Sequence, residues 1–568
     1  MPFTAAEQTL ANMRQLMGKR RRQRNAEIDL SFRRTAAHHK HCSLKLGCPD
    51  SLLLEHITAP MFGLNVSNSK YRNLAPIATL VGLGLFILTL GIRFAYTFLD
   101  EVYFAEPVIN LLRGDGYTTA AWYDSTSTQT HVSTAPIYSF FLYLWLGLWG
   151  ISQYAVRALP VLFALLGAAV LWRACVRLGW VQGGRAASLL IALMLLDYGA
   201  AFSYSCGRPD SLSFLLLAAL LYLASFPDRP QALWLMGLVG VLLPFVQWSA
   251  AIFTFCLCGA LFILFRQRVL KPGLVIFSGV ILGFIAQRLI YWKLGLWDTV
   301  VRTIEGEGAT NVFQRIFDRL TSDPLSNHHN VIPKDITSLI LLAGFAVIFV
   351  RSKQIGDPVG ERLAKAAAII ALAVGIGMYF LGKFPTYYGW MLCAPLGVIL
   401  VMYGERVGSQ RRGAWATALS IGILACAAGL PFQFLVALHD WNDRQPGPFT
   451  AWLQGKISQD DVVYCDYPYY YPVKFRAKRV YTGFYINHMT PAEAQQVTMV
   501  ILDPRKPWFG APKIDLSKAR ETSRWTARRT SLFGNSMQFG FLSSPNYECL
   551  VFDLKPAPAQ TVPAGDSP

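Results

Sequence analysis

The sequence predicts an all-α polytopic membrane protein that ends in a small α/β domain. Of the 568 residues, 53% are hydrophobic and only 15% are charged, and a soluble protein with so few charges would struggle to cover its surface. Continuous apolar runs, near the length that crosses a bilayer, recur from about residue 74 to about residue 433. After about residue 434 the pattern changes to short runs typical of strands and turns.

The apolar runs predict about eleven membrane spans. A further apolar run, APIYSFFLYLWLGLWGI at residues 135–151, is long enough to be mistaken for another span. The predicted spans are 74–96, 157–178, 185–204, 211–227, 231–248, 249–268, 272–293, 335–351, 363–382, 387–403 and 414–433.

The charges in the loops decide how residues 135–151 lie. Basic residues cluster in the short loops, as expected on the cytoplasmic side of a membrane. If residues 135–151 crossed the membrane, Arg173, Arg177 and Arg185 would lie outside and every later basic loop would be inverted. If this aromatic-rich run lies along the outer surface instead, all of these loops fall inside. We therefore expect a juxtamembrane helix here, a cytoplasmic N-terminus and an extracytoplasmic C-terminal domain, in a cell membrane.

Four parts of the chain are expected. Residues 1–73 form a basic, flexible cytoplasmic segment, residues 74–433 the transmembrane domain, residues 434–555 an extracytoplasmic α/β domain and residues 556–568 a disordered tail rich in proline and alanine. The net charge of +18 lies largely in segments that would face anionic headgroups, which favours membrane lipids over nucleic acid as partners. Strands are expected at Asp461–Tyr467, Thr498–Asp503 and Glu548–Leu554, and Cys465 and Cys549 could pair.

Two adjacent acids, Asp100 and Glu101, follow the first span, and Asp210 in the stretch CGRPD returns to the same predicted side. Acids at the ends of spans are costly to dehydrate, so we expect them to face a water-filled cavity. Asp100 alone could simply cap a helix that begins near Val102. The second acid on the same side favours a functional site.

Such carboxylates suit glycosyl transfer from a lipid-phosphate sugar. A carboxylate can take the proton from the acceptor hydroxyl, while the sugar centre develops oxocarbenium character. The phosphate leaving group needs cationic or hydrogen-bonding partners. Candidates for these contacts are Arg208, Lys383 and the loop arginines Arg302, Arg315 and Arg319, while Trp122, Tyr123, Tyr387 and Tyr388 could line the path of the sugar or lipid.

Several stretches carry a resemblance to a known family. LDEVYFAEPVINLLRGD resembles the Asp-Glu motif of the GT-C glycosyltransferases, in the branch of protein O-mannosyltransferases, aminoarabinose transferases and galacturonosyl transferases. The stretch GRPDSLSFLLLAALLYLA is similar to the second acidic motif of that branch, and GKFPTYYGWMLCAPLGVIL to a later turn and span. The likeness covers roughly residues 75–403 and is strongest from 98 to 225.

The resemblance implies roles for individual residues. Asp100 matches the catalytic base of the family and Glu101 its neighbour, while Asp210 matches the second acid and Lys383 a lysine near the lipid phosphate. Many relatives have Lys-Pro-Pro where this chain has Thr134-Ala135-Pro136. The phosphate contact of that lysine is therefore missing, with His131 as a candidate substitute.

The sequence thus predicts a glycosyltransferase that moves a sugar from a lipid-phosphate donor to an extracytoplasmic lipid, glycan or protein. The resemblance implies that the donor is a polyprenyl phosphate and that the sugar carbon is inverted. No metal is expected to be required, although the three carboxylates could bind a divalent ion. The alternative is a solute or lipid transporter whose acids relay protons or ions, although transporters usually carry such groups near the bilayer midplane. An inactive scaffold is a third reading, because a fold does not guarantee an activity.

Overall fold

Helices dominate the part of the chain that the computed structural model describes, which comprises residues 73–93, 97–122, 127–226, 229–265, 267–300, 335–381, 386–505, 513–516, 519–528 and 546–555. The predicted N-terminal segment and tail lie outside these residues, except for Asn73. The helices before the C-terminal region are α4 (Leu74–Phe86) with its π-helical continuation η1 (Ile87–Gly91), α5 (Leu99–Arg113), α6 (Pro136–Trp149), α7 (Gln153–Arg177), α8 (Gly184–Leu196), α9 (Tyr198–Ser205), α10 (Asp210–Ala224), α11 (Pro230–Val246), α12 (Trp248–Phe265), α13 (Gln267–Lys293), α16 (Ile336–Gln354), α17 (Pro358–Leu381), η3 (Thr386–Tyr388), α18 (Trp390–Gly408), α19 (Arg412–Ala428) and α20 (Leu430–His439).

Each of the eleven predicted spans falls on a helix or on a bent pair of helices. Among the described residues, five helices are long and apolar enough to cross a membrane, or seven if each bent pair counts as one span. Three of the four remaining predicted spans fall on the shorter apolar helices α10, α11 and α12, and the fourth, 363–382, falls on α17, which has 24 residues. The number of spans therefore stays a prediction, while the helical membrane architecture is established.

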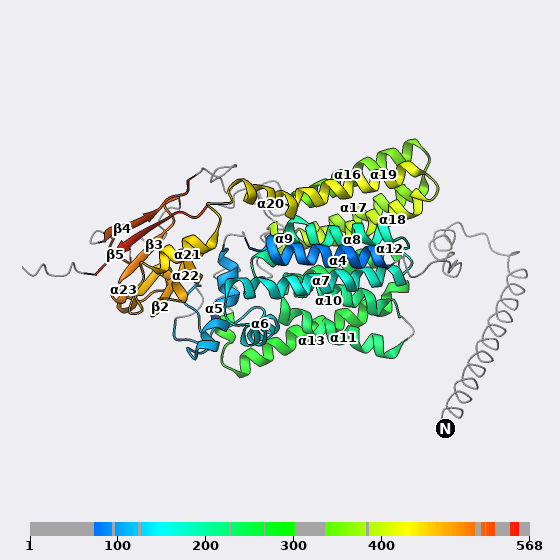
Figure 1. Cartoon of the computed structure of the whole chain (residues 1–568). Helices are drawn as coiled ribbons and strands as arrows, with labels where there is room; N and C mark the ends of the chain where they lie inside the picture. The colour runs from blue at the N-terminus through cyan, green and yellow to red at the C-terminus, as the bar shows by residue number, and fades with distance from the viewer. Residues whose placement is uncertain are drawn as a thin grey trace, which may run out of the picture. The chain divides into compact units, whose positions relative to one another are not determined.

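The run at residues 135–151 forms α6, a 14-residue helix that Pro136 opens at its first turn. Figure 1 shows α6 almost end-on, whereas α7 and α10 run across the view, so α6 crosses the direction of the bundle. Its large apolar side chains Phe140, Leu148 and Trp149 are exposed. This orientation agrees with the prediction of a helix that lies along the membrane surface.

Two helix pairs bend sharply and meet at their bends. The axes of α8 and α9 differ by 51° at Asp197, and those of α19 and α20 differ by 41° at Gly429. A Cβ atom on Gly429 would collide with the carbonyl oxygen of Leu196. Only glycine therefore allows the two bends to approach this closely.

The basic loops gather at one end of the bundle. Glu405 accepts hydrogen bonds from the backbone N–H groups of Gln182 and Gly183, both at 2.8 Å, and Arg411 donates to the carbonyl of Ile355 at 3.3 Å. Asp100 and Asp210 meet at the opposite end (Figure 1, where α5 lies away from the right-hand ends of α16 and α19). The shared end of the acids is thus confirmed, and which end faces the cytoplasm stays a prediction.

The C-terminal region is a five-stranded mixed sheet with the strand order β2-β1-β3-β5-β4. The pairings of β1 with β2 and β3 are parallel, and those of β5 with β3 and β4 are antiparallel. The three predicted strands are confirmed as β1, β3 and β5. Because β3 lies between β1 and β5, Cys465 and Cys549 are separated, and both are free thiols. The elements are α21 (Pro446–Gln454), β1 (Val462–Cys465), η4 (Tyr467–Tyr469), α22 (Tyr470–Lys474), β2 (Arg479–Thr482), η5 (Gly483–Asn487), α23 (Pro491–Gln496), β3 (Met499–Leu502), β4 (Arg520–Trp525) and β5 (Cys549–Asp553).

Candidate active site

The turn between α9 and α10 places two of the charged residues. Gly207 has φ +61°, and a Cβ atom there would lie 2.9 Å from Val156 Cγ1 and 3.3 Å from Glu101 Cγ. Its carbonyl accepts a hydrogen bond from the hydroxyl of Tyr138 at 2.6 Å. A turn held this closely against α5, α6 and α7 fixes the backbone that carries Arg208 and Asp210.

The first turn of α5 carries both adjacent acids, and they point to different partners. The N-cap residue of α5 is Phe98, with no side-chain cap, so the interpretation of Asp100 as a helix cap is wrong. Asp100 pairs with Arg208. Glu101 pairs with Arg157 of α7.

Arg208 joins two carboxylates in what we call the Asp–Arg–Asp cluster, which consists of Asp100, Arg208 and Asp210. Its Nη1 donates to Asp100 and its Nε donates to Asp210 Oδ2 at 2.8 Å. The guanidinium carbon lies 3.5 Å from the centre of the Tyr387 ring, within the range of a cation–π contact. The predicted residues Asp100, Arg208, Asp210 and Tyr387 are therefore brought together.

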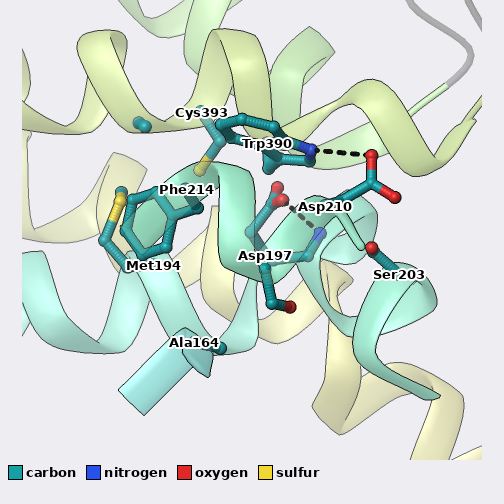
Figure 2. A pocket seen from close by; sticks show the side chains of 11 residues that line it. Ala164, Met194, Asp197, Ser203, Asp210, Phe214, Trp390 and Cys393 are labelled. Carbon is teal, nitrogen blue, oxygen red and sulfur yellow. Dashed lines mark hydrogen bonds between the residues drawn. The ribbon is translucent and has the colours of Figure 1, made fainter. Parts of the chain in front are cut away.

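Asp210 has little freedom to act on a substrate. Its Oδ2 accepts from Arg208, and its Oδ1 accepts from Gln247 Nε2 at 2.9 Å and from Trp390 Nε1 at 3.4 Å. Figure 2 shows the indole of Trp390 directed at Asp210. A buried carboxylate with both oxygens occupied orients its partner Arg208 rather than meeting water.

Exposure separates the three acids. The side chain of Asp100 is 14% exposed, whereas those of Asp210 and Glu101 are fully buried. A carboxylate that takes a proton must reach the group that gives it. Asp100 is therefore the acid of the three that an acceptor can approach.

Glu101 forms a buried bidentate ion pair. Its two oxygens accept from Arg157 Nε at 2.9 Å and from Nη2 at 2.8 Å, and Arg157 Nη1 also donates to the carbonyl of Ile92 at 3.0 Å. The parallel hydrogen bonds fix the geometry of both side chains. This pair fastens the start of α5 to the bundle.

Comparison with solved structures identifies the architecture. ArnT from Cupriavidus metallidurans, solved bound to undecaprenyl phosphate, is similar to this chain with a TM-score of 0.50 and 13% identity, over 85% of this chain and 98% of that chain. The chain therefore has the fold of that structure, a GT-C fold. The archaeal oligosaccharyltransferase AglB from Archaeoglobus fulgidus, in complex with an inhibitory peptide and a dolichol-phosphate, gives a TM-score of 0.40 at 12% identity, over 77% of this chain and 70% of that chain, a score too low to support an argument. No protein-family model matches the sequence, and no match to a curated protein is found.

The GT-C fold and the apolar helices make this chain an integral membrane protein. Within that fold, Tyr388 is buried beside the cluster, with its ring centre 5.9 Å from the guanidinium carbon of Arg208. His131 is also buried, and its ring packs edge-on against Tyr103 of α5 at 5.2 Å. Tyr103 lies one turn of α5 beyond Asp100, so His131 is placed away from Asp100. A contact of His131 with phosphate stays a prediction.

Other residues assigned from the sequence are only partly placed. Trp122 is buried between Tyr103 and Phe484, with ring centres 4.7 and 5.7 Å away, so it packs between α5 and the C-terminal domain. Several candidates lie outside the described residues, and their roles stay predictions: Lys383, Tyr123, Arg302, Arg315 and Arg319. No three His, Cys, Asp or Glu side chains come together as a metal site within the described residues, and metal dependence stays untested.

The GT-C bundle also holds an acid that the sequence reasoning missed. Asp197 is buried at the bend between α8 and α9, and its Oδ2 accepts from the backbone N–H of Ala200 at 2.8 Å. It lines a small pocket together with Ser203, Asp210 and Trp390 (Figure 2). The position of Asp197 inside a long apolar run could have revealed it from the sequence, because acids rarely occur in membrane spans without a function.

Proposed function

We propose that this protein is a membrane glycosyltransferase that moves a sugar from a polyprenyl-phosphate donor to an extracytoplasmic lipid, glycan or protein, with inversion at the sugar carbon. The observation that carries the proposal is the pairing of Asp100, the partly exposed acid among the three acids of the site, with the buried guanidinium of Arg208. A base for the acceptor and a cation for the leaving phosphate therefore lie side by side at one end of a GT-C bundle.

Asp100 acts as the general base that removes the proton from the acceptor hydroxyl. Arg208 holds the donor phosphate and stabilises the charge that grows on it as the sugar leaves. A guanidinium has five N–H donors, and the two carboxylates use only two of them in the hydrogen bonds described above. Asp210 and Tyr387 hold the guanidinium in place, which leaves its remaining donors for the phosphate.

The donor class is supported by the similar fold of ArnT, whose structure holds undecaprenyl phosphate. A lipid of that kind would reach Arg208 from the apolar bundle, while a polar acceptor would reach Asp100 from the water-facing side. The partial exposure of Asp100 fits that division. The proposed orientation has the N-terminus in the cytoplasm and the C-terminal domain outside the cell membrane.

The test is transfer by the purified full-length protein in lipid nanodiscs, with a panel of polyprenyl-phosphate sugars and candidate acceptors. Asp100→Asn should lower turnover by about 100-fold or more, because general-base catalysis contributes about 10²–10⁴-fold. Asp115→Asn is the matched control, since Asp115 follows the same helix and its side chain is 58% exposed. Turnover by Asp100→Asn at the wild-type rate would refute the base assignment, and retention of the donor's anomeric configuration in the product would refute inversion.

One observation favours the transporter alternative, namely a buried acid at a helix bend. Asp197 occupies such a position between α8 and α9, and discontinuous helices with polar groups are typical of transporter sites. Solute uptake into liposomes that is lost in Asp197→Asn, with no sugar transfer by the wild type under any donor, would support transport and reject the transferase.

A further inference from the structure

A lysine of the C-terminal domain is buried against a helix that comes more than 360 residues earlier in the chain. Lys474, at the end of α22, is only 8% exposed. Its Nζ donates to Asn110 Oδ1 of α5 at 2.6 Å and lies 3.9 Å from Glu106 Oε1 of the same helix. The ammonium group therefore contacts two successive turns of the helix that begins with Asp100.

Further contacts tie the same end of α5 to the domain. Arg113 Nη1 donates to the backbone carbonyl of Lys474 at 2.7 Å. Glu106 Oε2 accepts from Thr119 Oγ1 at 2.7 Å and from the backbone N–H of Ala120 at 3.0 Å, so the loop after α5 is held by the same carboxylate. Lys474 thus lies at the centre of a buried polar junction between the domain, α5 and the loop that follows it.

Forming this junction costs free energy, because it buries charged groups. Burial lowers the pKa of Lys474 despite its proximity to Glu106, and burial raises the pKa of Glu106 despite the nearby ammonium group. Buried charges of this kind are weak evidence for added stability, but they can specify one arrangement among several. The arrangement that Lys474 specifies is the position of α5 on the C-terminal domain.

The geometry gives that arrangement a consequence for the site. Glu101 fastens the first turn of α5 to Arg157, about 13 Å along the helix from Asn110 at 1.5 Å per residue. A helix fixed at one point can still tilt and turn about it, and a second fixed point removes that freedom. Two anchors therefore set the direction in which Asp100 faces Arg208.

We propose that Lys474 is a positioning residue for the transfer reaction: from the C-terminal domain, it holds α5 in the orientation that aligns Asp100 with the acceptor. The proposal rests on the proposed transferase function. It gives the domain a role in turnover that is separate from any binding of the acceptor.

The test compares Lys474→Met with Lys478→Met in the full-length protein. Lys478 is an exposed lysine four residues further along the same domain, so its replacement removes the same charge without touching α5. Lys474→Met should lower kcat by about 10-fold or more, because a misplacement of about 1 Å can cost about 100-fold, while KM for the donor stays within about twofold. Lys474→Arg should recover part of the loss, and Lys478→Met should match the wild type.

Hydrogen–deuterium exchange of α5 separates this inference from the proposed function. Amides of residues 103–113 should exchange faster in Lys474→Met than in Lys478→Met, whether or not a sugar substrate is known. Faster exchange without transfer by the wild type would refute the transferase and leave the anchor standing. Unchanged exchange, or a loss confined to KM, would overturn the positioning role.

A second variant covers the case in which Lys474→Met does not fold because Glu106 is left buried without an opposite charge. The double variant Glu106→Gln/Lys474→Met removes both charges and should fold, since replacing a whole buried pair is often neutral. Its kcat should stay low because the hydrogen bond to Asn110 is still missing. A folded double variant with wild-type kcat would overturn the proposal.

Discussion

Replacing Glu101 by glutamine should destabilise the fold by about 3–5 kcal/mol, the usual cost of breaking a buried ion pair. Glu101 is fully buried and Arg157 is 2% exposed, so water cannot replace the lost carboxylate. Glutamine keeps the shape and one oxygen, but its amide nitrogen would face a guanidinium N–H that now donates to the second oxygen at 2.8 Å. One hydrogen bond survives, which places the expected loss near 3 kcal/mol, or about 150-fold in the unfolding equilibrium.

The assay is denaturant unfolding of the full-length protein in detergent, followed by tryptophan fluorescence. Asp100→Asn is the neighbouring control, because Asp100 is partly exposed and its loss leaves Arg208 paired with Asp210. That variant should lose less stability than Glu101→Gln, because the guanidinium of Arg208 keeps the carboxylate of Asp210 as its partner. The double variant Glu101→Gln/Arg157→Met should recover most of the stability, because it removes both buried charges.

A Glu101→Gln variant as stable as the wild type would refute this reasoning. If that variant were also inactive, Glu101 would act in the chemistry, as the family resemblance implies for the Asp-Glu motif. A stable Glu101→Gln variant with full turnover would mean that neither role applies. One denaturant unfolding curve and one measurement of turnover for Glu101→Gln distinguish these three outcomes.

Three further predictions concern single contacts. Gly207→Ala should cost about 1–3 kcal/mol of stability, because the φ of +61° at this residue and the approach of Val156 disfavour a Cβ atom. The denaturant midpoint should fall accordingly, and an unchanged midpoint would contradict this prediction. Burial alone would raise the pKa of Asp461, but hydrogen bonds from Lys555, Ser458 and Thr498 outweigh burial and lower that pKa. Asp461 therefore contributes stability above its unfolded pKa of about 3.9, and that stability is lost as pH falls through the folded pKa, so Asp461→Asn should flatten the loss of the denaturant midpoint in acid. Gln247→Leu should raise KM for the donor, because Asp210 loses its hydrogen bond at 2.9 Å and holds Arg208 less firmly, and an unchanged KM would count against that chain of contacts.

Much of the fold follows from patterns that are local in the sequence. Apolar length predicts the helices, and the charges of the loops predict that residues 135–151 lie along the membrane surface rather than cross it. The structure forms a helix there, α6, which crosses the direction of the bundle. β2 and β4 were missed for different reasons. β2 has only two apolar residues, Val480 and Tyr481, between Arg479 and Thr482, while β4 is largely exposed and polar, so neither carries the apolar run that predicted the three inner strands.

The sequence predicts the acids of the candidate site and Arg208, the partner that two of them share, but it misses the partners Arg157, Gln247 and Trp390. Asp100, Glu101 and Asp210 are recognisable because charged residues stand out beside apolar runs. Their contacts join residues that are 56, 37 and 180 positions apart, in the pairs of Glu101 with Arg157 and of Asp210 with Gln247 and Trp390. The spacing of residues along the chain gives no signal for such pairs. They form only when α5, α7, α10, α18 and the end of α11 pack together.

The way the C-terminal sheet ends has a consequence for solubility. The edge strand β4 exposes Arg520, Glu521 and Arg524, and charged edges resist pairing with another chain. At the other edge, Thr482 of β2 donates its backbone N–H to the carbonyl of Ala120, in the loop that follows α5. That loop therefore occupies the last backbone N–H of an edge strand, at a position where another strand could otherwise add. Variants that detach this loop from β2 should aggregate as well as lose turnover. The yield of soluble protein after purification would therefore show whether the junction around Lys474 is intact before any substrate is known.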